Sequence, residues 1–357
     1  MSRADPPAMQ MPHVRQLDGF RAIAVSIVFI AHCGLERIVP GGFGVTIFFF
    51  LSGYLITSLL RSEHAQTGGI DLKAFYWRRT LRIWPPLYIT IAAVWLGMLV
   101  FFPGDRVDPW GVVAQLAFIS NYSYLWGHAQ GLDLPLWSLA VEEHFYLIFP
   151  LLFMFAIARM SRTKAVMTCA LLCLLILLVR IGYAALYGPL NIVYYWSHTR
   201  IDSILFGCCL ALHNNPLLDR DAWRPKLPAA ILAIAVLLFC LVYRDPVFRQ
   251  TLRYSLQGVA LYVLFSYALH DSGLPARILS SPPLRLLSLY SYTFYLVHVM
   301  IIRIVEDYLH IGSLIPLVLL SGAATMAYCA LMYHFVEKPL AQRRKRLHSV
   351  DAQATIA

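Results

Sequence analysis

The first apolar stretch of the chain carries three polar residues at helical spacing. In the segment LDGFRAIAVSIVFIAHCG, Asp18 and Arg21 are three residues apart, and Arg21 and His32 are eleven apart. On an α-helix these spacings place the three side chains on one face, with about 16 Å of rise between Arg21 and His32. An imidazole there could serve as a general base or as a nucleophile. The plain alternatives are a packed core histidine and an interfacial Asp18–Arg21 anchor pair.

A cationic cluster precedes the third apolar stretch, in the segment FYWRRTLRIWPPLY. Arg78 and Arg82 are four residues apart and should share one face of a short helix, with Arg79 beside them, before Pro85 and Pro86 begin the next span. Guanidinium groups bind phosphate bidentately, so the cluster predicts a site for a phosphorylated ligand. Binding of anionic lipid headgroups, or membrane orientation alone, would also account for it.

Further polar residues interrupt later apolar stretches, where an ionisable group costs at least ~2.5–3.5 kcal/mol at mid-bilayer. Glu142 and Glu143 lie together in LPLWSLAVEEHFYLIFPLL, which indicates a polar cavity, and we expect Glu142 to orient His32 or to stabilise its imidazolium form. Arg200 and Asp202 are two residues apart, so they should have different partners. The remaining candidate site residues are Trp137, Ser138, Tyr292 and His298.

The composition indicates what kind of structure must position these residues. Only 13% of the 357 residues are charged, 59% are hydrophobic, and the mean hydropathy is +0.64. Such values exclude a disordered chain and argue against an ordinary soluble enzyme. We therefore predict an all-α polytopic membrane bundle of about ten transmembrane helices. The expected spans are 17–34, 43–60, 84–102, 137–158, 165–187, 199–213, 227–243, 251–269, 287–305 and 314–336, with 110–122 re-entrant or interfacial.

The net charge of +10 is explained by membrane orientation rather than by nucleic acid. With both termini cytoplasmic, 20 of the 29 Lys and Arg residues lie on the cytoplasmic side and 7 on the other, as the positive-inside rule requires. We expect a short cytoplasmic segment over 1–13, a membrane domain over 14–345 and a disordered cytoplasmic tail over 346–357. The spacing of the seven cysteines predicts neither a metal site nor a disulfide framework. The small residues of GGFGVTIFFFLSGYL predict close helix packing.

Seven segments in order resemble the integral-membrane acyltransferase 3 family of bacterial O-acyltransferases. They are LDGFRAIAVSIVFIAH, GGFGVTIFFFLSGYLI, FYWRRTLRIWPPLY, LWSLAVEEHFYLIFPLL, RIDSILFG, SYTFYLVH and FVEKPL, and together they cover about residues 14–345. The resemblance implies ten membrane helices in the bacterial inner membrane. Some family members add an extracellular hydrolase-like domain, and we expect this chain to be a stand-alone form.

The resemblance also implies an activity, namely transfer of an acyl group, usually acetyl, from acyl-coenzyme A to a hydroxyl. It implies that His32 is catalytic, as general base or acyl carrier, and that Arg78, Arg79 and Arg82 bind the donor. Acyl-coenzyme A would be a co-substrate, with no bound cofactor. The acceptor could be a cell-envelope carbohydrate, a lipid-linked glycan or a macrolide. The residues alone would also suit a transporter with an intramembrane proton or substrate path, although no internal repeat supports one.

Overall fold

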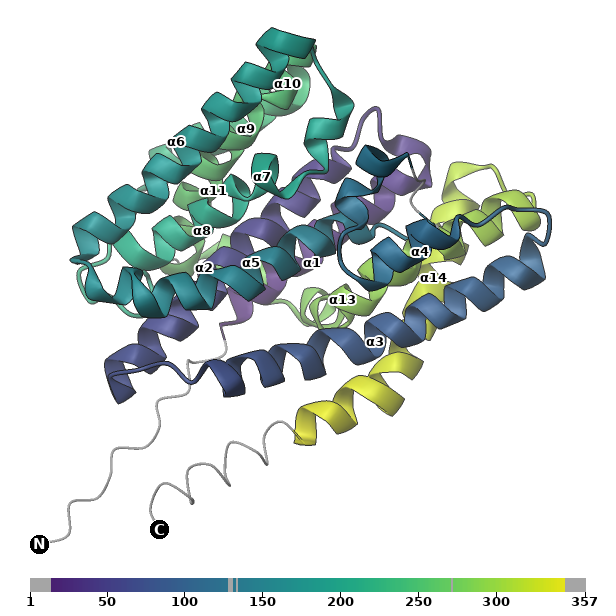
Figure 1. The fold of residues 1–357 in the computed structure, drawn as a ribbon, viewed down its shortest axis with the longest axis horizontal. Coiled ribbons are helices and arrows are strands. Elements are labelled where there is room, and N and C mark those ends of the chain that lie inside the picture. Colours follow the sequence, from purple (N-terminus) through teal and green to yellow (C-terminus); the bar gives the residue numbers. More distant parts are fainter. Residues whose placement is uncertain (1–13, 128–130, 133, 271, 344–357) are drawn as a thin grey trace, which may run out of the picture.

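The computed structural model describes residues 14–127, 131–132, 134–270 and 272–343 (Figure 1). Within these residues the chain forms helices and no strands, so the predicted all-α fold is confirmed. The segment 1–13 and the tail 346–357, for which we predicted cytoplasmic positions, lie outside the described residues.

Seven helical spans of the described chain are long and apolar enough to cross a membrane. Each span consists of one α-helix, in some cases extended by a short helical turn at its end. The seven helices are α1 (Arg15–Ile30), α2 (Gly41–Thr67), α3 (Leu72–Phe101), α5 (Leu136–Phe155), α6 (Arg162–Tyr187), α13 (Pro282–Arg303) and α14 (Leu314–Met332). The apolar windows of α6 and α14 are each only 22% buried within the protein, so their outer faces are available to lipid. The chain is therefore a multi-pass membrane protein.

The other three predicted spans are also helical but differ in length. They are α8 (Asp202–His213), α9 (Leu227–Val242) and α11 (Leu252–His270). At 1.5 Å per residue the 12 residues of α8 rise about 18 Å, less than the ~30 Å of a hydrocarbon core. The short helix α7 (Ser197–Arg200) precedes it, so the span predicted as continuous over 199–213 is broken next to Arg200 and Asp202. Nearly every residue of α8 is buried, which shields this break from lipid.

Glycines allow α2 and α8 to pack very closely. A Cβ atom at Gly53 would collide with the carbonyl oxygen of Ile204, and one at Gly207 would collide with that of Phe50. A Cβ at Gly44 would likewise collide with the Ala24 carbonyl of α1. The small residues of the second span therefore serve helix packing, as predicted.

The basic segment is not a separate short helix, so that prediction is wrong. α3 continues for 30 residues through both Pro85 and Pro86 and carries Arg78, Arg79 and Arg82 in its first half. The region 110–122 forms the 8-residue helix α4 (Pro109–Leu116) and a 3₁₀ segment over Ser120–Trp126. Neither element is long enough to span a bilayer, as expected for this region.

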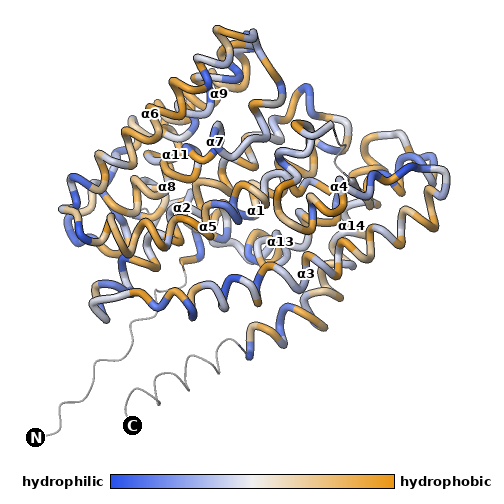
Figure 2. The backbone as a smooth tube through the Cα atoms, viewed as in Figure 1, coloured by the Kyte–Doolittle hydropathy of each residue, from blue (hydrophilic) through white to orange (hydrophobic). Residues whose placement is uncertain are grey.

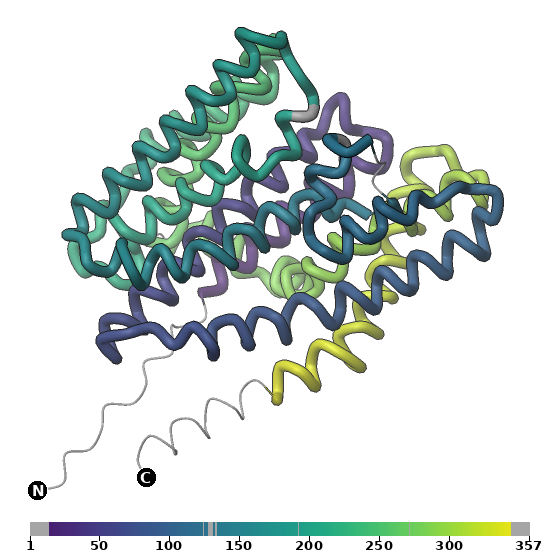
Figure 3. The backbone as a smooth tube through the Cα atoms, viewed as in Figure 1, coloured from purple at the N-terminus to yellow at the C-terminus, as the bar shows by residue number. Residues whose placement is uncertain are grey.

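The helix contacts fall into two groups that α1 joins, one built on α2 and the other on α13. α1 contacts both α2 and α13, α2 packs on α8, and α8 contacts α6 and α11 (Figure 1). On the other side α13 contacts α3 and α14, and Figure 3 shows these C-terminal helices beside the N-terminal ones. Figure 2 shows apolar residues along the lengths of the helices and polar residues mainly at their ends. α1 and α13 are thus held side by side in the interior.

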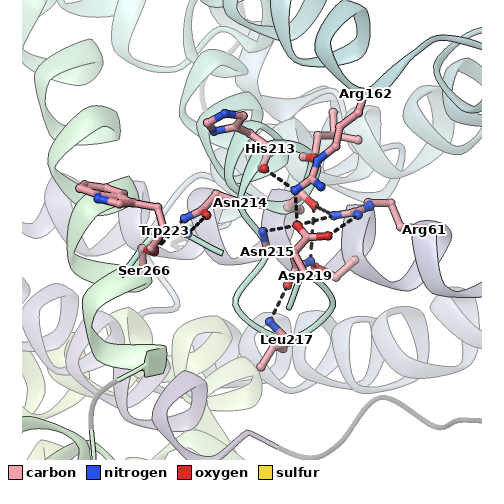
Figure 4. A network of polar contacts seen from close by, with 12 residues as sticks. Arg61, Arg162, His213, Asn214, Asn215, Leu217, Asp219, Trp223 and Ser266 are labelled. Carbon is pink, nitrogen blue, oxygen red and sulfur yellow. Dashed lines mark hydrogen bonds and ion pairs between the residues drawn. The ribbon is translucent and has the colours of Figure 1, made fainter. Parts of the chain in front are cut away.

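A network of ion pairs connects the helices at one end of the bundle (Figure 4). Asp219 lies in the connection between α8 and α9, and its Oδ1 is 2.8 Å from Nη2 of Arg61 at the end of α2. Arg162, which begins α6, also pairs with Asp219. The backbone N–H of Asn215 donates to Asp219 Oδ2 at 2.7 Å. Asp219 therefore ties three elements together at the end that we predicted to be cytoplasmic.

Candidate active site

His32 lies in a wide, π-type helical turn, Ala31–Leu35, that continues α1. Within this turn Gly34 has a φ of +88°, a left-handed conformation that favours glycine. Ala31 and Cys33 on either side are buried, whereas His32 itself is exposed. Wide turns of this type occur often at functional sites. Here the turn leaves the imidazole of His32 accessible while the neighbouring Ala31 and Cys33 side chains stay buried between the helices.

His32 contacts His298 of α13, another residue predicted for the site. Nδ1 of His32 is 3.1 Å from Nε2 of His298, and the ring centroids are 5.0 Å apart. His298 is fully buried, and its Nδ1 is 2.8 Å from the Tyr295 carbonyl oxygen and 3.1 Å from that of Phe294. Nδ1 of His32 is also 3.0 Å from the carbonyl oxygen of Val28. Two imidazoles are thus fixed by backbone groups of α1 and α13.

These contacts assign the tautomers of both neutral rings. A carbonyl oxygen only accepts hydrogen bonds, so Nδ1 of His298 must carry the proton and donate. Nε2 of a neutral His298 is then an acceptor, and the hydrogen-bond network assigns the donated proton to Nδ1 of His32. Nε2 of His32 is left with a free lone pair. This is the nitrogen that a general base or nucleophile requires.

His32 lines a cavity of about 480 Å³. The cavity lies where α1, α2 and α5 meet the segment 191–195 and the ends of α9 and α11. Glu36, one turn beyond His32, also lines it and interacts electrostatically with His32. A second cavity of about 510 Å³ near Arg162 and Trp223 contains none of the predicted site residues.

Trp137 and Ser138 at the start of α5 extend the site beside the two histidines. Trp137 lines the same cavity, and its ring centroid is 4.6 Å from that of Tyr194. The Ser138 hydroxyl is 2.6 Å from the hydroxyl of Tyr295, which also lines the cavity. Because the Tyr295 carbonyl holds His298, the same residue connects α5 to the histidine pair.

Glu142 belongs to a separate polar centre, so its predicted role of orienting His32 is wrong for this geometry. Its Oε2 accepts hydrogen bonds from Tyr146 at 2.6 Å and from Ser52 at 3.1 Å, and it interacts electrostatically with Arg79 and Arg21. About one and a half turns of α5 separate Glu142 from Trp137, the residue of that helix that lines the cavity. Among the described contacts, His298 and the Val28 carbonyl orient His32.

The three arginines of α3 have different surroundings, although the sequence groups them. Arg78 pairs with Glu63 of α2 at 3.6 Å. The guanidinium of Arg79 lies 5.1 Å from the centroid of the Tyr146 ring, next to the Glu142 centre. Arg82 is exposed and interacts electrostatically with Arg21. Arg79 and Arg82 thus add positive charge to the Glu142 centre, whereas Arg78 pairs with Glu63 near the end of α2.

The Glu142 centre, which is the inner polar centre of the protein, is surrounded by four more of the predicted site residues: Arg21, Asp18, Glu143 and Tyr292. Arg21 interacts electrostatically with Arg82, Asp18, Tyr146 and Arg79, which joins the polar stripe of α1 to α3 and α5. Asp18 accepts a hydrogen bond from Ser288 at 3.3 Å. Glu143 has a buried Oε1 with no hydrogen-bond partner among the described residues, and the Tyr292 hydroxyl donates to the Ile83 carbonyl at 2.8 Å.

Arg200 and Asp202 have different partners, as predicted. Asp202 pairs with Arg180 of α6 at 2.7 Å, and both side chains are fully buried. Arg200 donates to Thr46 at 3.1 Å, and its guanidinium lies 3.8 Å from the centroid of the Tyr254 ring. Their two-residue spacing places the side chains on opposite sides of the broken sixth span.

Sequence reasoning missed several residues of the site. Glu36 could have been found from its spacing of four from His32, and Tyr295 from its position three before His298. Tyr194, in the 3₁₀ segment Asn191–Tyr194, and Arg253, at the start of α11, also line the cavity, and the local sequence does not reveal their placement. Within the described residues no group of three or more His, Cys, Asp and Glu side chains could hold a metal ion.

Comparison with known proteins shows the family to which this chain is similar. The acyltransferase 3 family, described as an acyltransferase domain, matches residues 14–334. "O-acetyltransferase OatA" of Staphylococcus aureus (strain NCTC 8325 / PS 47) is 30% identical over 346 residues, which cover 92% of this chain and 57% of that protein. "Putative peptidoglycan O-acetyltransferase YrhL" of Bacillus subtilis (strain 168) is 30% identical over 359 residues, covering 92% and 55%.

The chain thus spans little more than half the length of these curated relatives. No solved structure matches it. The family match includes both histidines, the basic half of α3 and the Glu142 centre. The chain belongs to the integral-membrane acyltransferase 3 family.

Proposed function

We propose that this protein is an O-acyltransferase of the bacterial inner membrane that moves an acyl group, in the first place acetyl, from acyl-coenzyme A to a hydroxyl of a cell-envelope carbohydrate. The observation that carries the proposal is the His32–His298 pair at the edge of a cavity, with the lone pair of His32 Nε2 available. The names of the relatives, an O-acetyltransferase and a putative peptidoglycan O-acetyltransferase, favour acetyl and a glycan acceptor.

The inner polar centre suits the phosphates of coenzyme A. Arg79, Arg82 and Arg21 lie there together with Glu142, Glu143 and Asp18, and the exposed Arg82 has a guanidinium that a phosphate can reach. About 16 Å of helix rise separates Arg21 from His32. An extended pantetheine arm would bridge this interval, with its phosphates at the arginines and its thioester at the histidine.

His32 then supplies the proton transfer. In the direct route, Nε2 takes the proton of the acceptor hydroxyl as that oxygen attacks the thioester carbonyl. The tetrahedral intermediate collapses, the C–S bond breaks, and the coenzyme A thiolate takes the proton from His32. His298 accepts the hydrogen bond from His32 Nδ1 throughout and keeps the ring in orientation. General-base catalysis of this kind is typically worth ~10²–10⁴-fold.

The same geometry also permits an acyl-histidine route. Nε2 attacks the thioester carbonyl, the C–S bond breaks and the thiolate leaves. The acceptor oxygen then attacks the acyl carbon, the N–C bond breaks, and the hydroxyl proton passes to the freed Nε2 and from there to the thiolate. The two routes differ in one observable. Radiolabelled acetyl-coenzyme A without acceptor leaves label on the protein in the acyl-histidine route and none in the direct route.

The test of the proposal is transfer by purified protein in lipid nanodiscs. Protein, labelled acetyl-coenzyme A and a panel of oligosaccharides should give labelled glycan, and His32→Ala should lower the rate by at least 100-fold. His270→Ala is the matched control, because His270 also bonds the carbonyl four residues before it, at 2.8 Å, and lies at the end of α11 outside the cavity. Near-normal transfer by folded His32→Ala protein would contradict the assignment.

A further inference from the structure

The cavity beside His32 has a cationic wall. Arg244, Arg249 and Arg253 line it, on the connection after α9, on α10 (Pro246–Gln250) and at the start of α11, and Glu36 is the carboxylate among its lining residues. These arginines lie at the end predicted to be non-cytoplasmic, where the chain places only 7 of its 29 Lys and Arg residues. The positive-inside rule explains charge at the opposite end, so this cluster needs another explanation.

None of these three arginines forms an ion pair among the described residues. Arg244 donates to the backbone carbonyl of Arg37 at 2.8 Å. Arg253 Nη2 donates to the Tyr254 hydroxyl at 2.9 Å, and its buried Nε has no hydrogen-bond partner within the described chain. Burial, followed by repulsion from Arg253 and Arg244, lowers the pKa of Arg249, so the three guanidinium groups lie close enough to repel one another. They form a site with unused hydrogen-bond donors and excess positive charge.

A fourth guanidinium lies directly behind the cavity wall. Arg200 is fully buried and stacks on Tyr254 and Tyr194, both of which line the cavity. Its Nε and Nη1 have no hydrogen-bond partner among the described residues, while the nearby Asp202 is paired with Arg180. A buried charge without a counter-ion is strongly unfavourable. An anion in the cavity would offset this charge together with those of the wall.

The cavity also has an aromatic lining. Trp137, Tyr194, Tyr195 and Tyr295 line it, and the Trp137 ring centroid is 5.2 Å from that of Tyr195. Aromatic rings of this kind offer flat apolar surfaces with polar edges, which suit the C–H faces and hydroxyls of a sugar ring. Gln257 contributes a buried Oε1 that has no partner in the described part of the chain and could accept from a hydroxyl.

We infer that the acceptor is an anionic saccharide. Its sugar ring packs on Trp137 and the tyrosines, its reacting hydroxyl reaches His32 Nε2, and its oxyanion binds Arg249 and Arg253. A carboxylate on the sugar and a phosphate on the sugar share this recognition chemistry. The inference rests on the proposed function, because it names the acceptor class for the same site.

The experiment compares matched acceptors that differ in charge. Methyl glucuronide, its neutral amide, methyl glucoside and the corresponding glycosyl phosphate are each offered with acetyl-coenzyme A, and the ratio of kcat/KM for anionic over neutral acceptor is measured. We expect a ratio of about tenfold or more in the wild type, as for a hydrogen-bonded charge, falling toward one in Arg249→Gln and Arg253→Gln. Arg106→Gln is the control, since Arg106 is exposed, does not line the cavity and belongs to the same predicted non-cytoplasmic set of arginines. The glucuronide and phosphate arms identify which oxyanion is preferred.

Binding of the same glycosides to His32→Ala protein, measured by calorimetry, separates this inference from the catalytic proposal. Arginine-dependent preference for the anionic glycosides without any transfer by the wild type would support the anion site and overturn the proposed activity. Transfer with equal kcat/KM for anionic and neutral acceptors would overturn the anion site and leave the activity standing. A charge preference that survives Arg249→Gln and Arg253→Gln would also overturn it.

Discussion

Replacing His298 tests whether the second histidine acts through the first. His298 accepts a hydrogen bond from His32 Nδ1, which becomes a bond to a charged group whenever His32 takes up a proton. Hydrogen bonds to charged groups contribute about 1.5–3 kcal/mol, and each 1.4 kcal/mol is tenfold in rate. We therefore expect His298→Phe, which keeps a ring in this buried position but cannot accept the bond, to lower kcat about 10- to 150-fold. The donor KM should stay constant, because the arginine centre lies about three helical turns away.

The matched variant is His298→Gln. A glutamine amide can accept from His32 with its oxygen and donate to the Tyr295 carbonyl with its nitrogen, so it preserves both contacts of the imidazole. Glutamine should restore much of the rate that phenylalanine loses. Both variants must first elute as monodisperse protein with a melting temperature near that of the wild type.

A double-mutant cycle separates positioning from a general effect on the fold. If His298 acts only through His32, adding His298→Phe to His32→Ala leaves the residual rate unchanged. An equal loss in both backgrounds would refute the reasoning. So would equal activities of the glutamine and phenylalanine variants, since only one of them keeps the hydrogen bonds.

Three further substitutions have defined outcomes. Arg79→Lys keeps the charge but loses the bidentate fork, so the KM for acyl-coenzyme A should rise about tenfold in initial-rate assays. Asp219→Asn weakens the pairing of two guanidinium groups and should lower the unfolding free energy by about 1–3 kcal/mol, seen as a lower melting temperature, whereas the same change at exposed Asp221 should not. Gly53→Ala should destabilise by about 1–3 kcal/mol through its collision with α8, while Gly69→Ala, in open space, should not.

The sequence predicted the helices well because lipid imposes a strong constraint on composition. Each expected apolar span is helical, and the small residues around Gly53 pack as expected. Boundaries and breaks were harder to predict. Pro85 and Pro86 indicated a helix start, yet α3 passes through them, since a proline-containing membrane helix can rely on neighbouring groups for its freed carbonyls. The break before Asp202 lies next to the buried pairing of Asp202 with Arg180, and no local sequence pattern indicates either one.

The site was predicted residue by residue but not in its arrangement. Spacing on α1 correctly placed Arg21 and His32 along one helix, but spacing gives no information about contacts between helices. His32 and His298 are 266 residues apart, and only the packing of α1 on α13 brings them together. Glu142 looked like the partner of His32 because both interrupt apolar spans. The direction of α5 places it instead with Tyr146 and Ser52.

The arrangement along α1 explains why the cationic regions are separated. Arg21 joins the inner centre with Arg79 and Arg82, and His32 faces the outer cavity with Arg249 and Arg253. The exposed Arg82 at the inner end and Arg249 and Arg253 at the outer end can each bind an anion, and the imidazole pair lies between these two regions. If the arginines were continuous along the path, an anionic donor and an anionic acceptor would compete for one site. In the proposed mechanism the histidines lie between two separate cationic regions, so each substrate would have its own charge partner while the acyl carbon and the hydroxyl meet at His32 Nε2.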